Sequence, residues 1–197
     1  MKIGAIILAA GASTRMGTSK QMLQVNGEYL LTRTIKTVEG ASIDNIVVVL
    51  GARDALHRTI INAQVHVVTN EAWAAGMGSS IKSGLQSLLS EHPDLDAVII
   101  LVCDQPMLTS EIIAGIISTF HTTRKPIVAS GYSDSAGVPA LFARSYFDKL
   151  NELPDDQGAK KVILQNSADV VVVPFPGGAI DLDTMEDYQK FVKTGHQ

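Results

Sequence analysis

The sequence predicts an α/β fold in which a mostly parallel β-sheet is covered by helices on both faces. Apolar runs rich in β-branched residues alternate with segments whose apolar residues recur at helical spacing. Such runs are typical of parallel strands that are buried on both faces. The chain has 197 residues, of which 46% are hydrophobic and 18% charged, so we expect a single globular domain over residues 1–197.

The apolar runs predict strands over 3–8, 46–50, 65–68, 97–102, 127–129 and 170–173. The helical periodicity predicts helices over 30–38, from Ser79 through residue 89, over 112–120, and from Thr184 onward. The run after Met1 and Lys2 is interpreted as a buried first strand and not as a secretory signal, since its positive region is a single lysine. Ligands bind at the carboxyl ends of parallel strands, which directs attention to the loops after Leu8, Leu50, Val68 and Val102.

Composition excludes several classes of protein. The formal net charge of −4 argues against a nucleic-acid surface, which requires basic patches. No apolar run approaches the roughly 18 residues of a membrane span. The one cysteine, Cys103, suits a reducing compartment, so a cytoplasmic location is expected, and Cys103 is interpreted as a small buried hydrophobe. The five histidines lack ligand spacing and are assigned no role.

The loop after the first strand contains the spacing Gly11-x3-Arg15-x-Gly17-x2-Lys20. Glycines let backbone N–H groups approach a ligand closely, and a row of such groups binds anions. The two cations suit a polyphosphate, so this loop is a predicted triphosphate site. The dinucleotide pattern GxGxxG is absent, and the P-loop is excluded because Met16 stands where its second glycine belongs. The alternative is a solvated turn with two surface cations.

Directly after a strand that reads IILAAG, this pattern resembles the molybdenum-cofactor-type nucleotidyltransferases. These are GT-A-like, three-layer Rossmann-like α/β enzymes that attach a nucleoside monophosphate to an acceptor, and the resemblance runs along nearly the whole chain. It implies a nucleotide site formed by Leu8, Ala9, Ala10, Gly11, Ser13, Arg15, Gly17, Lys20, Asn70, Gly76, Met77, Ser79 and Ser80. It also implies catalytic roles for Arg15, Lys20 and Asp104.

The segment 70–80 follows a predicted strand and opens a predicted helix. Its glycines, hydroxyls and free N–H groups suit a pocket for a base and a ribose. It resembles the N-x2-W-x2-GM-x-SS segment of the cytidylyltransferase branch. The alternative for Ser79 or Ser80 alone is helix capping. Lys82, one turn into the helix, is interpreted as a surface lysine.

Two acidic positions predict a metal site. Asp104 ends the strand over 97–102, where a carboxylate can hold Mg²⁺ against phosphates; otherwise it caps the next helix. Asp181 and Asp183 are two residues apart on an extended segment and therefore point the same way. The family carries D-x-P and DxDTPED at these places, which implies that Asp104 and one later acid bind magnesium, with Asp183 favoured over Asp181. Thr184 and Asp187 also fit a capping box.

The acceptor side carries departures from the family pattern. The resemblance implies that Gln105, Pro106, Gly137 and Pro139 lie near the acceptor, but Val138 stands where the family usually has a histidine. The segment 155–160 resembles the family's GDxGAR, with an aspartate and a lysine in place of its glycine and arginine. A solvated loop is the alternative for this segment.

Taken together, the resemblance implies a magnesium-dependent transfer of CMP from CTP to a molybdopterin-type acceptor. The cytidylyl branch has LAAG at the first loop, as here, whereas the guanylyl branch usually has LAGG. The product is the dinucleotide cofactor of xanthine-dehydrogenase-like enzymes, so such an enzyme is the implied recipient. A guanylyltransferase, a sugar-phosphate nucleotidyltransferase and a non-catalytic cofactor carrier remain alternatives.

Overall fold

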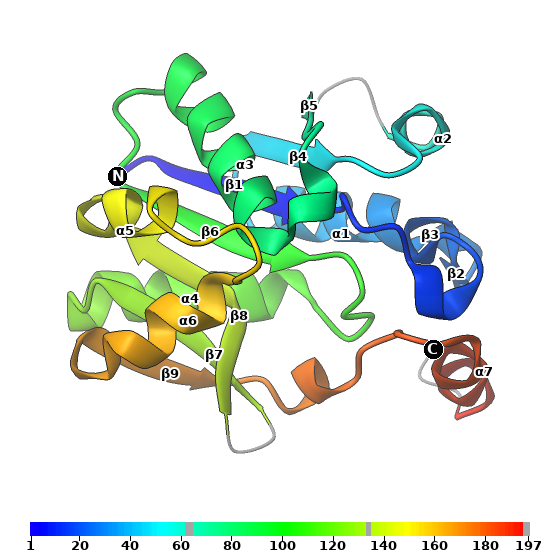
Figure 1. Cartoon of the computed structure of the whole chain (residues 1–197). Helices are drawn as coiled ribbons and strands as arrows, with labels where there is room; N and C mark the ends of the chain where they lie inside the picture. Colours follow the sequence, from blue (N-terminus) through cyan, green and yellow to red (C-terminus); the bar gives the residue numbers. More distant parts are fainter. Residues whose placement is uncertain (62–64, 133–134, 195–197) are drawn as a thin grey trace.

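The computed structural model describes residues 1–61, 65–132 and 135–194. Its main sheet has seven strands in the order β5-β4-β1-β6-β8-β7-β9 (Figure 1). These strands are β1 (Ile3–Leu8), β4 (Asn45–Leu50), β5 (His66–Thr69), β6 (Ala97–Val102), β7 (Ile127–Tyr132), β8 (Ser135–Ala143) and β9 (Val170–Pro174). β8 runs antiparallel to both neighbours and every other neighbouring pair is parallel, which confirms a mostly parallel sheet.

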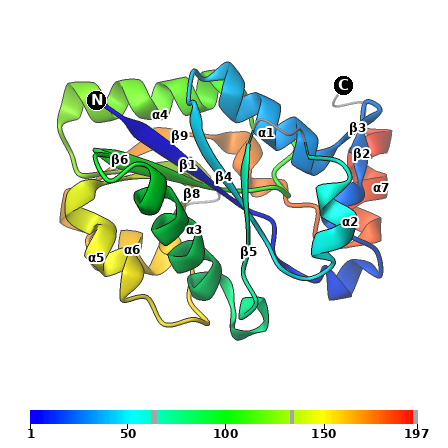
Figure 2. The same cartoon turned by 90° about the horizontal axis from the view of Figure 1, so that it is seen from above.

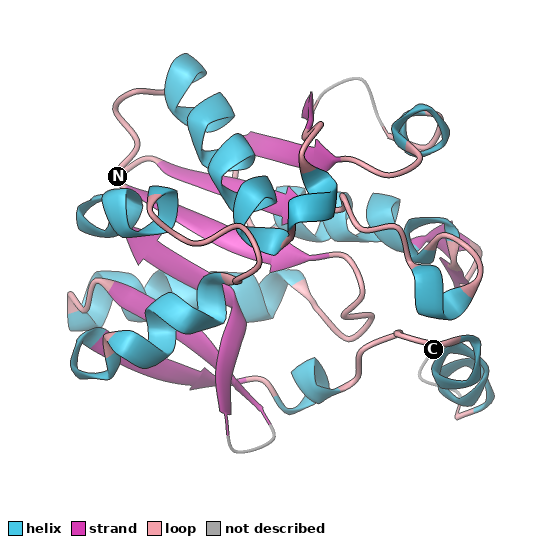
Figure 3. Cartoon of the chain, viewed as in Figure 1, coloured by secondary structure: helices cyan, strands magenta, loops and turns pink. Residues whose placement is uncertain are grey.

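Helices and a small second sheet complete the described chain (Figure 3). The α-helices are α1 (Leu30–Gly40), α2 (Asp54–Arg58), α3 (Met77–Glu91), α4 (Ser110–Thr123), α5 (Phe147–Asn151), α6 (Ala159–Gln165) and α7 (Met185–Lys193). The 3₁₀ helices are η1 (Thr14–Met16), η2 (Lys20–Met22), η3 (Trp73–Ala75), η4 (Arg144–Tyr146), η5 (Ser167–Asp169) and η6 (Pro176–Ala179). Strands β2 (Gln24–Val25) and β3 (Glu28–Tyr29) pair antiparallel.

Alternation along the strands divides the core into two layers. On β1, Ile6 and Leu8 join a cluster with residues of α3, α5 and α6, whereas Ala5 and Ile7 join one with residues of α1 and α4. Successive strand residues point to opposite faces, so an uninterrupted apolar run fills both layers. Figure 2 shows α1 and α4 on one face of the sheet and α3, α5 and α6 on the other. The predicted three-layer α/β fold is confirmed.

A third apolar cluster joins the loop after β1 to the end of the described chain. Met16 and Leu23 pack with Leu182 and Phe191, which brings α7 against the β2–β3 sheet. α7 begins with the capping box anticipated from the sequence, in which Asp187 N donates to Thr184 Oγ1 at 3.1 Å. The packing in this cluster therefore holds the segment before α7 close to the loop after β1.

Two local predictions were wrong. Strand β8 was missed because Gly137 and Pro139 break its apolar alternation. Helix α3 begins at Met77, two residues before the predicted start near Ser79; its N-cap is Gly76, and neither Ser79 nor Ser80 caps it. The interpretation of the first apolar run as a buried strand is confirmed by its position between β4 and β6. Among the described residues, no helix is long and apolar enough to cross a membrane.

Candidate active site

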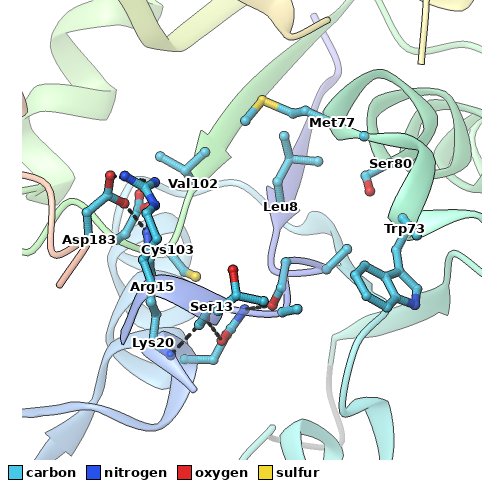
Figure 4. A pocket seen from close by; sticks show the side chains of 18 residues that line it. Leu8, Ser13, Arg15, Lys20, Trp73, Met77, Ser80, Val102, Cys103 and Asp183 are labelled. Atoms are coloured by element: carbon cyan, nitrogen blue, oxygen red, sulfur yellow. Dashed lines mark hydrogen bonds and ion pairs between the residues drawn. The ribbon is translucent and has the colours of Figure 1, made fainter. Parts of the chain in front are cut away.

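A pocket of about 530 Å³ opens where β1 and β6 end side by side (Figure 4). The loops after β1, β5 and β6 and the segment before α7 contribute its walls. It is lined by Leu8, Ala10, Gly11, Ala12, Ser13, Thr14, Arg15, Lys20, Gln21, Trp73, Ala74, Gly76, Met77, Ser80, Val102, Cys103, Asp104 and Asp183. Three of the four loops predicted to form the site, those after Leu8, Val68 and Val102, therefore line this pocket, whereas the loop after Leu50 does not.

The charged end of the pocket brings together residues from three distant parts of the chain. Lys20 Nζ donates to Asp104 Oδ2 at 2.9 Å and also to Asp183 Oδ1. Arg15 Nη2 lies 2.8 Å from Asp183 Oδ2. Only 14% of the Lys20 side chain is exposed, whereas 70% of the Arg15 side chain is exposed. Arg15 is thus the accessible cation and Lys20 the enclosed one.

The carboxylates and cations at this end shift one another's ionisation. Burial acts to lower the pKa of Lys20, but the charges and hydrogen bonds of Asp104 and Asp183 together outweigh it and raise that pKa. The hydrogen bond from Lys20, together with the charge of Arg15, lowers the pKa of Asp183. Lys20 and Asp183 are therefore both charged at neutral pH.

Asp181 differs from Asp183, although both were considered from the sequence. Desolvation of its carboxyl and the negative charges of Asp104 and Asp183 raise the pKa of Asp181 to about 6. Asp181 does not line the pocket, whereas Asp183 does and contacts both cations. The geometry therefore favours Asp183 as the partner of Asp104.

The donor set at this end fits a hard divalent cation. Asp104 and Asp183 each direct a carboxylate oxygen at the same ammonium group, so the two oxygens already converge on a positive charge. Mg²⁺ is usually bound by one or two carboxylates, with water and phosphate oxygens as the remaining ligands. Within the part of the chain that the structure describes, no group of three or more His, Cys, Asp or Glu residues is placed to hold a metal. Two protein ligands are therefore the set that these residues offer.

The opposite end of the pocket is mostly apolar. Leu8, Trp73 and Met77 surround it, with the Ser80 hydroxyl among them (Figure 4). Trp73 approaches the first loop closely because residue 51 is a glycine. A Cβ atom on Gly51 would lie 2.5 Å from Trp73 Cβ and 2.9 Å from the carbonyl oxygen of Ala10, so any side chain there would displace the indole.

Asn70 organises the loop behind this end. Its Nδ2 donates to Ser79 Oγ at 2.8 Å and to Ser80 Oγ at 3.0 Å, and its Oδ1 accepts from the Ala72 N–H. Asn70 and Ser79 are buried and do not line the pocket. Asn70 and Ser79, which were predicted to bind the nucleotide, therefore hold the shape of the loop instead. Of Asn70, Ser79 and Ser80, it is Ser80 that lines the pocket.

The segment 155–160 packs on the N-terminus of α3 and is not simply a solvated loop. The Gly78 N–H donates to the Asp155 carbonyl at 2.8 Å. Gly76 has φ +128°, and a Cβ there would lie 2.4 Å from the same carbonyl oxygen. Lys82 Nζ bonds the carbonyl of Leu153 at 3.0 Å and Asp155 Oδ1 at 2.5 Å. Lys82, interpreted as a surface lysine, therefore ties this segment to α3.

The pocket contains eleven of the predicted site residues. These are Leu8, Ala10, Gly11, Ser13, Arg15, Lys20, Gly76, Met77, Ser80, Asp104 and Asp183. Ala9, Gly17, Asn70, Ser79, Gln105, Pro106, Gly137 and Pro139 do not line it. Gln105 Nε2 instead donates to the carbonyls of Val138 and Gly178, both at 3.2 Å, so its amide group links three segments of the backbone.

Sequence reasoning missed several lining residues, of which Gln21 and Trp73 matter most. Trp73 is the single tryptophan of the chain and belongs to the N-x2-W-x2-GM-x-SS motif. The sequence therefore contained a signal for its place in the pocket. Gln21 gave no such signal. Cys103 lines the pocket yet is 5% exposed, and burial raises the pKa of its thiol to about 12. The prediction that Cys103 is a buried hydrophobe is confirmed.

Comparison with known proteins identifies the family. The model described as MobA-like NTP transferase domain matches residues 5–170. The chain belongs to this family. The MobA-like chain is 27% identical over 195 residues to the purine catabolism protein PucB of Bacillus subtilis (strain 168), covering 93% of this chain and 92% of that one. It is 30% identical over 156 residues to a probable molybdenum cofactor guanylyltransferase of Pyrococcus horikoshii, covering 77% and 75%.

Solved structures agree with this assignment. Rv0371c from Mycobacterium tuberculosis H37Rv superposes with a TM-score of 0.84 at 27% identity and covers 98% of both chains. A manganese complex of Rv0371c gives a TM-score of 0.76 at 25% identity, covering 98% of this chain and 100% of that one. The MobA-like chain is therefore a nucleotidyltransferase with the GT-A-like fold.

Proposed function

We propose that this nucleotidyltransferase moves CMP from CTP to the terminal phosphate of molybdopterin or its molybdenum form and releases pyrophosphate. The observation that carries the proposal is that a single pocket holds Arg15, Lys20, Asp104 and Asp183 beside an apolar end. A triphosphate requires cations and a metal-binding pair, whereas a base requires an apolar slot.

The two cations would bind the triphosphate and the leaving group. Arg15 is largely exposed and Lys20 is largely enclosed, and both line the pocket, so both positive charges are available to a bound triphosphate. Held against the β- and γ-phosphates, they would stabilise the negative charge that grows on departing pyrophosphate. The acceptor needs no strong base, because a phosphate monoester with a second pKa near ~6 is already ionised at neutral pH.

Asp104 and Asp183 would hold the divalent cation. Mg²⁺ bound by this pair would polarise the α-phosphate and neutralise charge between the two phosphates. In this arrangement both carboxylates would release the ammonium group of Lys20 and bind the metal instead. Lys20 would then bind phosphate oxygens. The manganese complex of Rv0371c supports a divalent cation in a related structure.

The apolar end favours a pyrimidine. Ala10 lines the pocket beside Leu8 and Trp73, and its methyl group narrows a space that a glycine would leave open. A missing or added methylene in an apolar pocket is worth about 1–3 kcal/mol of discrimination. The LAAG sequence therefore supports CTP over a purine nucleotide.

The acceptor and the recipient enzyme are inferred more indirectly. The relative named as a purine catabolism protein is consistent with a recipient of the xanthine dehydrogenase type, because xanthine is a purine. Gln105, Pro106, Gly137 and Pro139 do not line the pocket. Gln105 directly follows the lining residue Asp104 and donates to the Val138 carbonyl of β8, so we propose that the acceptor approaches from the side where β6 meets β8.

Transfer of GMP is the second candidate function. Its support is the 30% identity to a protein named as a probable molybdenum cofactor guanylyltransferase. The same charged end would serve GTP, so the two candidates differ at the apolar end alone.

A pyrophosphate-release assay tests the proposal. The purified chain is incubated with molybdopterin, Mg²⁺ and each of CTP, GTP, UTP and ATP. Release with CTP and molybdopterin together, abolished by EDTA, is the expected result. Release with GTP selects guanylyl transfer, and release with another acceptor such as a sugar phosphate selects that substrate class. Binding of molybdopterin without release for any nucleotide would contradict catalysis and favour a carrier.

A further inference from the structure

A chain of buried polar side chains lies beneath the first loop and ends at a histidine outside the pocket. Gln21 and Ser19 are each 3% exposed, and His57 on α2 is fully buried. Ser19 Oγ donates to Gln21 Oε1 at 2.7 Å and lies 2.6 Å from His57 Nε2. A buried polar group that loses its hydrogen-bond partner is costly, so each hydrogen bond among these three side chains contributes to the local structure.

The direction of each hydrogen bond follows from the donors available. Gln21 Nε2 donates to the carbonyls of Ala9 at 2.9 Å and Gly11 at 3.3 Å, which leaves Oε1 as the acceptor. The hydroxyl of Ser19 uses its one hydrogen on that oxygen, so Ser19 Oγ must accept from His57 Nε2–H. In the neutral ring, this places the proton of His57 on Nε2. Among the described residues its Nδ1 is buried without a hydrogen-bond partner.

The Gln21 end of this chain of contacts acts on residues that form the pocket. Ala9 and Gly11 flank Ala10, which lines the apolar end. Lys20 lies between Ser19 and Gln21 in the sequence, and its backbone N–H donates to Ser13 Oγ at 3.1 Å. The same amide of Gln21 therefore fixes the start of the loop, and its neighbours fix the position from which Lys20 reaches Asp104.

We infer that His57, Ser19 and Gln21 form a positioning relay that holds the first loop in the conformation that receives the triphosphate. This rests on the proposal that the loop binds a nucleoside triphosphate. His57 does not line the pocket, so it acts through Ser19 and Gln21 and is a positioning residue. Without the relay, the loop would become ordered only when the nucleotide binds. The entropy lost in that ordering would weaken the affinity for the nucleotide.

The test measures nucleotide affinity in the purified wild type and in four variants, His57→Leu, His57→Gln, Ser19→Ala and Thr32→Val. Emission from Trp73, the single tryptophan, reports titrations with MgCTP and with MgGTP. His57→Leu removes the donor to Ser19, whereas His57→Gln places an amide N–H where Nε2 stood. Thr32→Val is the matched control, because Thr32 Oγ1 makes one hydrogen bond, at 2.9 Å to the carbonyl of Ile60, in the same region and away from the loop.

The expected result is an affinity about three- to tenfold weaker in His57→Leu, which corresponds to one lost hydrogen bond. His57→Gln should recover most of it, and Thr32→Val should match the wild type. If His57→Leu does not fold, Ser19→Ala breaks the relay at a smaller residue and should give the same weakening.

Two failures are distinguishable. If the wild type binds neither nucleotide, the proposed function is contradicted and the inference falls with it. If the wild type binds one of them and His57→Leu and Ser19→Ala bind it as tightly as Thr32→Val does, the relay alone is contradicted. Equal weakening in His57→Leu and His57→Gln would also overturn it, because the hydrogen bond would then not be the cause.

Discussion

The two ends of the pocket are built on different principles. At the charged end, Lys20 and Arg15 come from one loop, while Asp104 and Asp183 come from segments far away in the sequence. At the other end, Leu8, Trp73 and Met77 form an apolar wall (Figure 4), and Ala10 also lines the pocket. The charged end depends on electrostatics and is sensitive to the loss of one charge. The apolar end depends on shape and is sensitive to the gain or loss of one methyl group.

The largest effect is expected at the charged end. Asp104→Ala should lower the turnover number at least about 100-fold, by analogy with the removal of one electrostatic stabiliser. Asp183→Asn should have a similar effect, since Asp183 faces the same ammonium group. Steady-state pyrophosphate release measures both, with melting temperatures to verify folding.

Asp181→Asn is the matched control for these two variants, because Asp181 is close enough to feel both charges but does not line the pocket. Its turnover should fall far less than that of Asp104→Ala. Near-normal turnover in Asp104→Ala, or a loss in Asp181→Asn as large as in Asp183→Asn, would contradict the assignment of the metal pair.

A smaller effect is expected at the apolar end. Ala10→Gly removes one methyl group from the wall and should shift the ratio of kcat/KM for CTP and GTP toward GTP by about tenfold. Turnover with CTP at saturation should change little, because the charged end is untouched. An unchanged ratio would mean that Ala10 does not limit the size of the base.

Acid should weaken the support beneath the charged end. Burial, with a smaller contribution from Arg53, lowers the pKa of His57 below the 6.5 of an exposed histidine, while Asp54 opposes this shift. As the pH falls, this histidine therefore binds a proton at a higher pH in the unfolded chain than in the folded protein. The stability that His57 contributes is present above pH 6.5 and is lost as the pH falls through its lower folded pKa.

Thermal unfolding at pH 7.5 and pH 5 measures this contribution. Between pH 7.5 and pH 5, the melting temperature of the wild type should fall more than that of His57→Gln, because glutamine does not titrate. Equal losses in the two proteins would show that His57 does not carry the acid sensitivity.

The smallest effect concerns Cys103. Burial raises the pKa of its thiol to about 12, so almost none of it is thiolate at pH 8. A disulfide reagent such as DTNB should label the native protein far more slowly than the unfolded protein. Fast labelling of the native protein would mean that the pocket exposes Cys103, contrary to its 5% exposure.

The sequence predicted the elements whose cause is local. β1 and β6 are continuous apolar runs that begin directly after a charged residue, and both have the predicted bounds. The capping box at Thr184 was readable because its two members are three residues apart. Arg15 and Lys20 were found because a glycine-rich loop with two cations directly follows a buried strand.

The rest depends on contacts between distant residues. The serines near the start of α3 suggested caps, but Asn70 binds both hydroxyls, and Asn70 is nine residues earlier in the chain. His57 showed no ligand spacing, and its partner Ser19 is 38 residues away. A single sequence does not reveal such a pairing, because neither residue type is unusual at its own position.

A thermal-shift panel with CTP, GTP, UTP and ATP, each with and without Mg²⁺, tests both ends of the pocket in one experiment. A ligand at about 100 times its dissociation constant adds about 2.7 kcal/mol of stability, or roughly 5–10 °C for a domain of this size. We expect that shift for CTP with Mg²⁺, and its loss in Asp104→Ala. No shift with any nucleotide, or a full shift with CTP in Asp104→Ala, would contradict a pocket that pairs a metal-dependent triphosphate site with a pyrimidine slot.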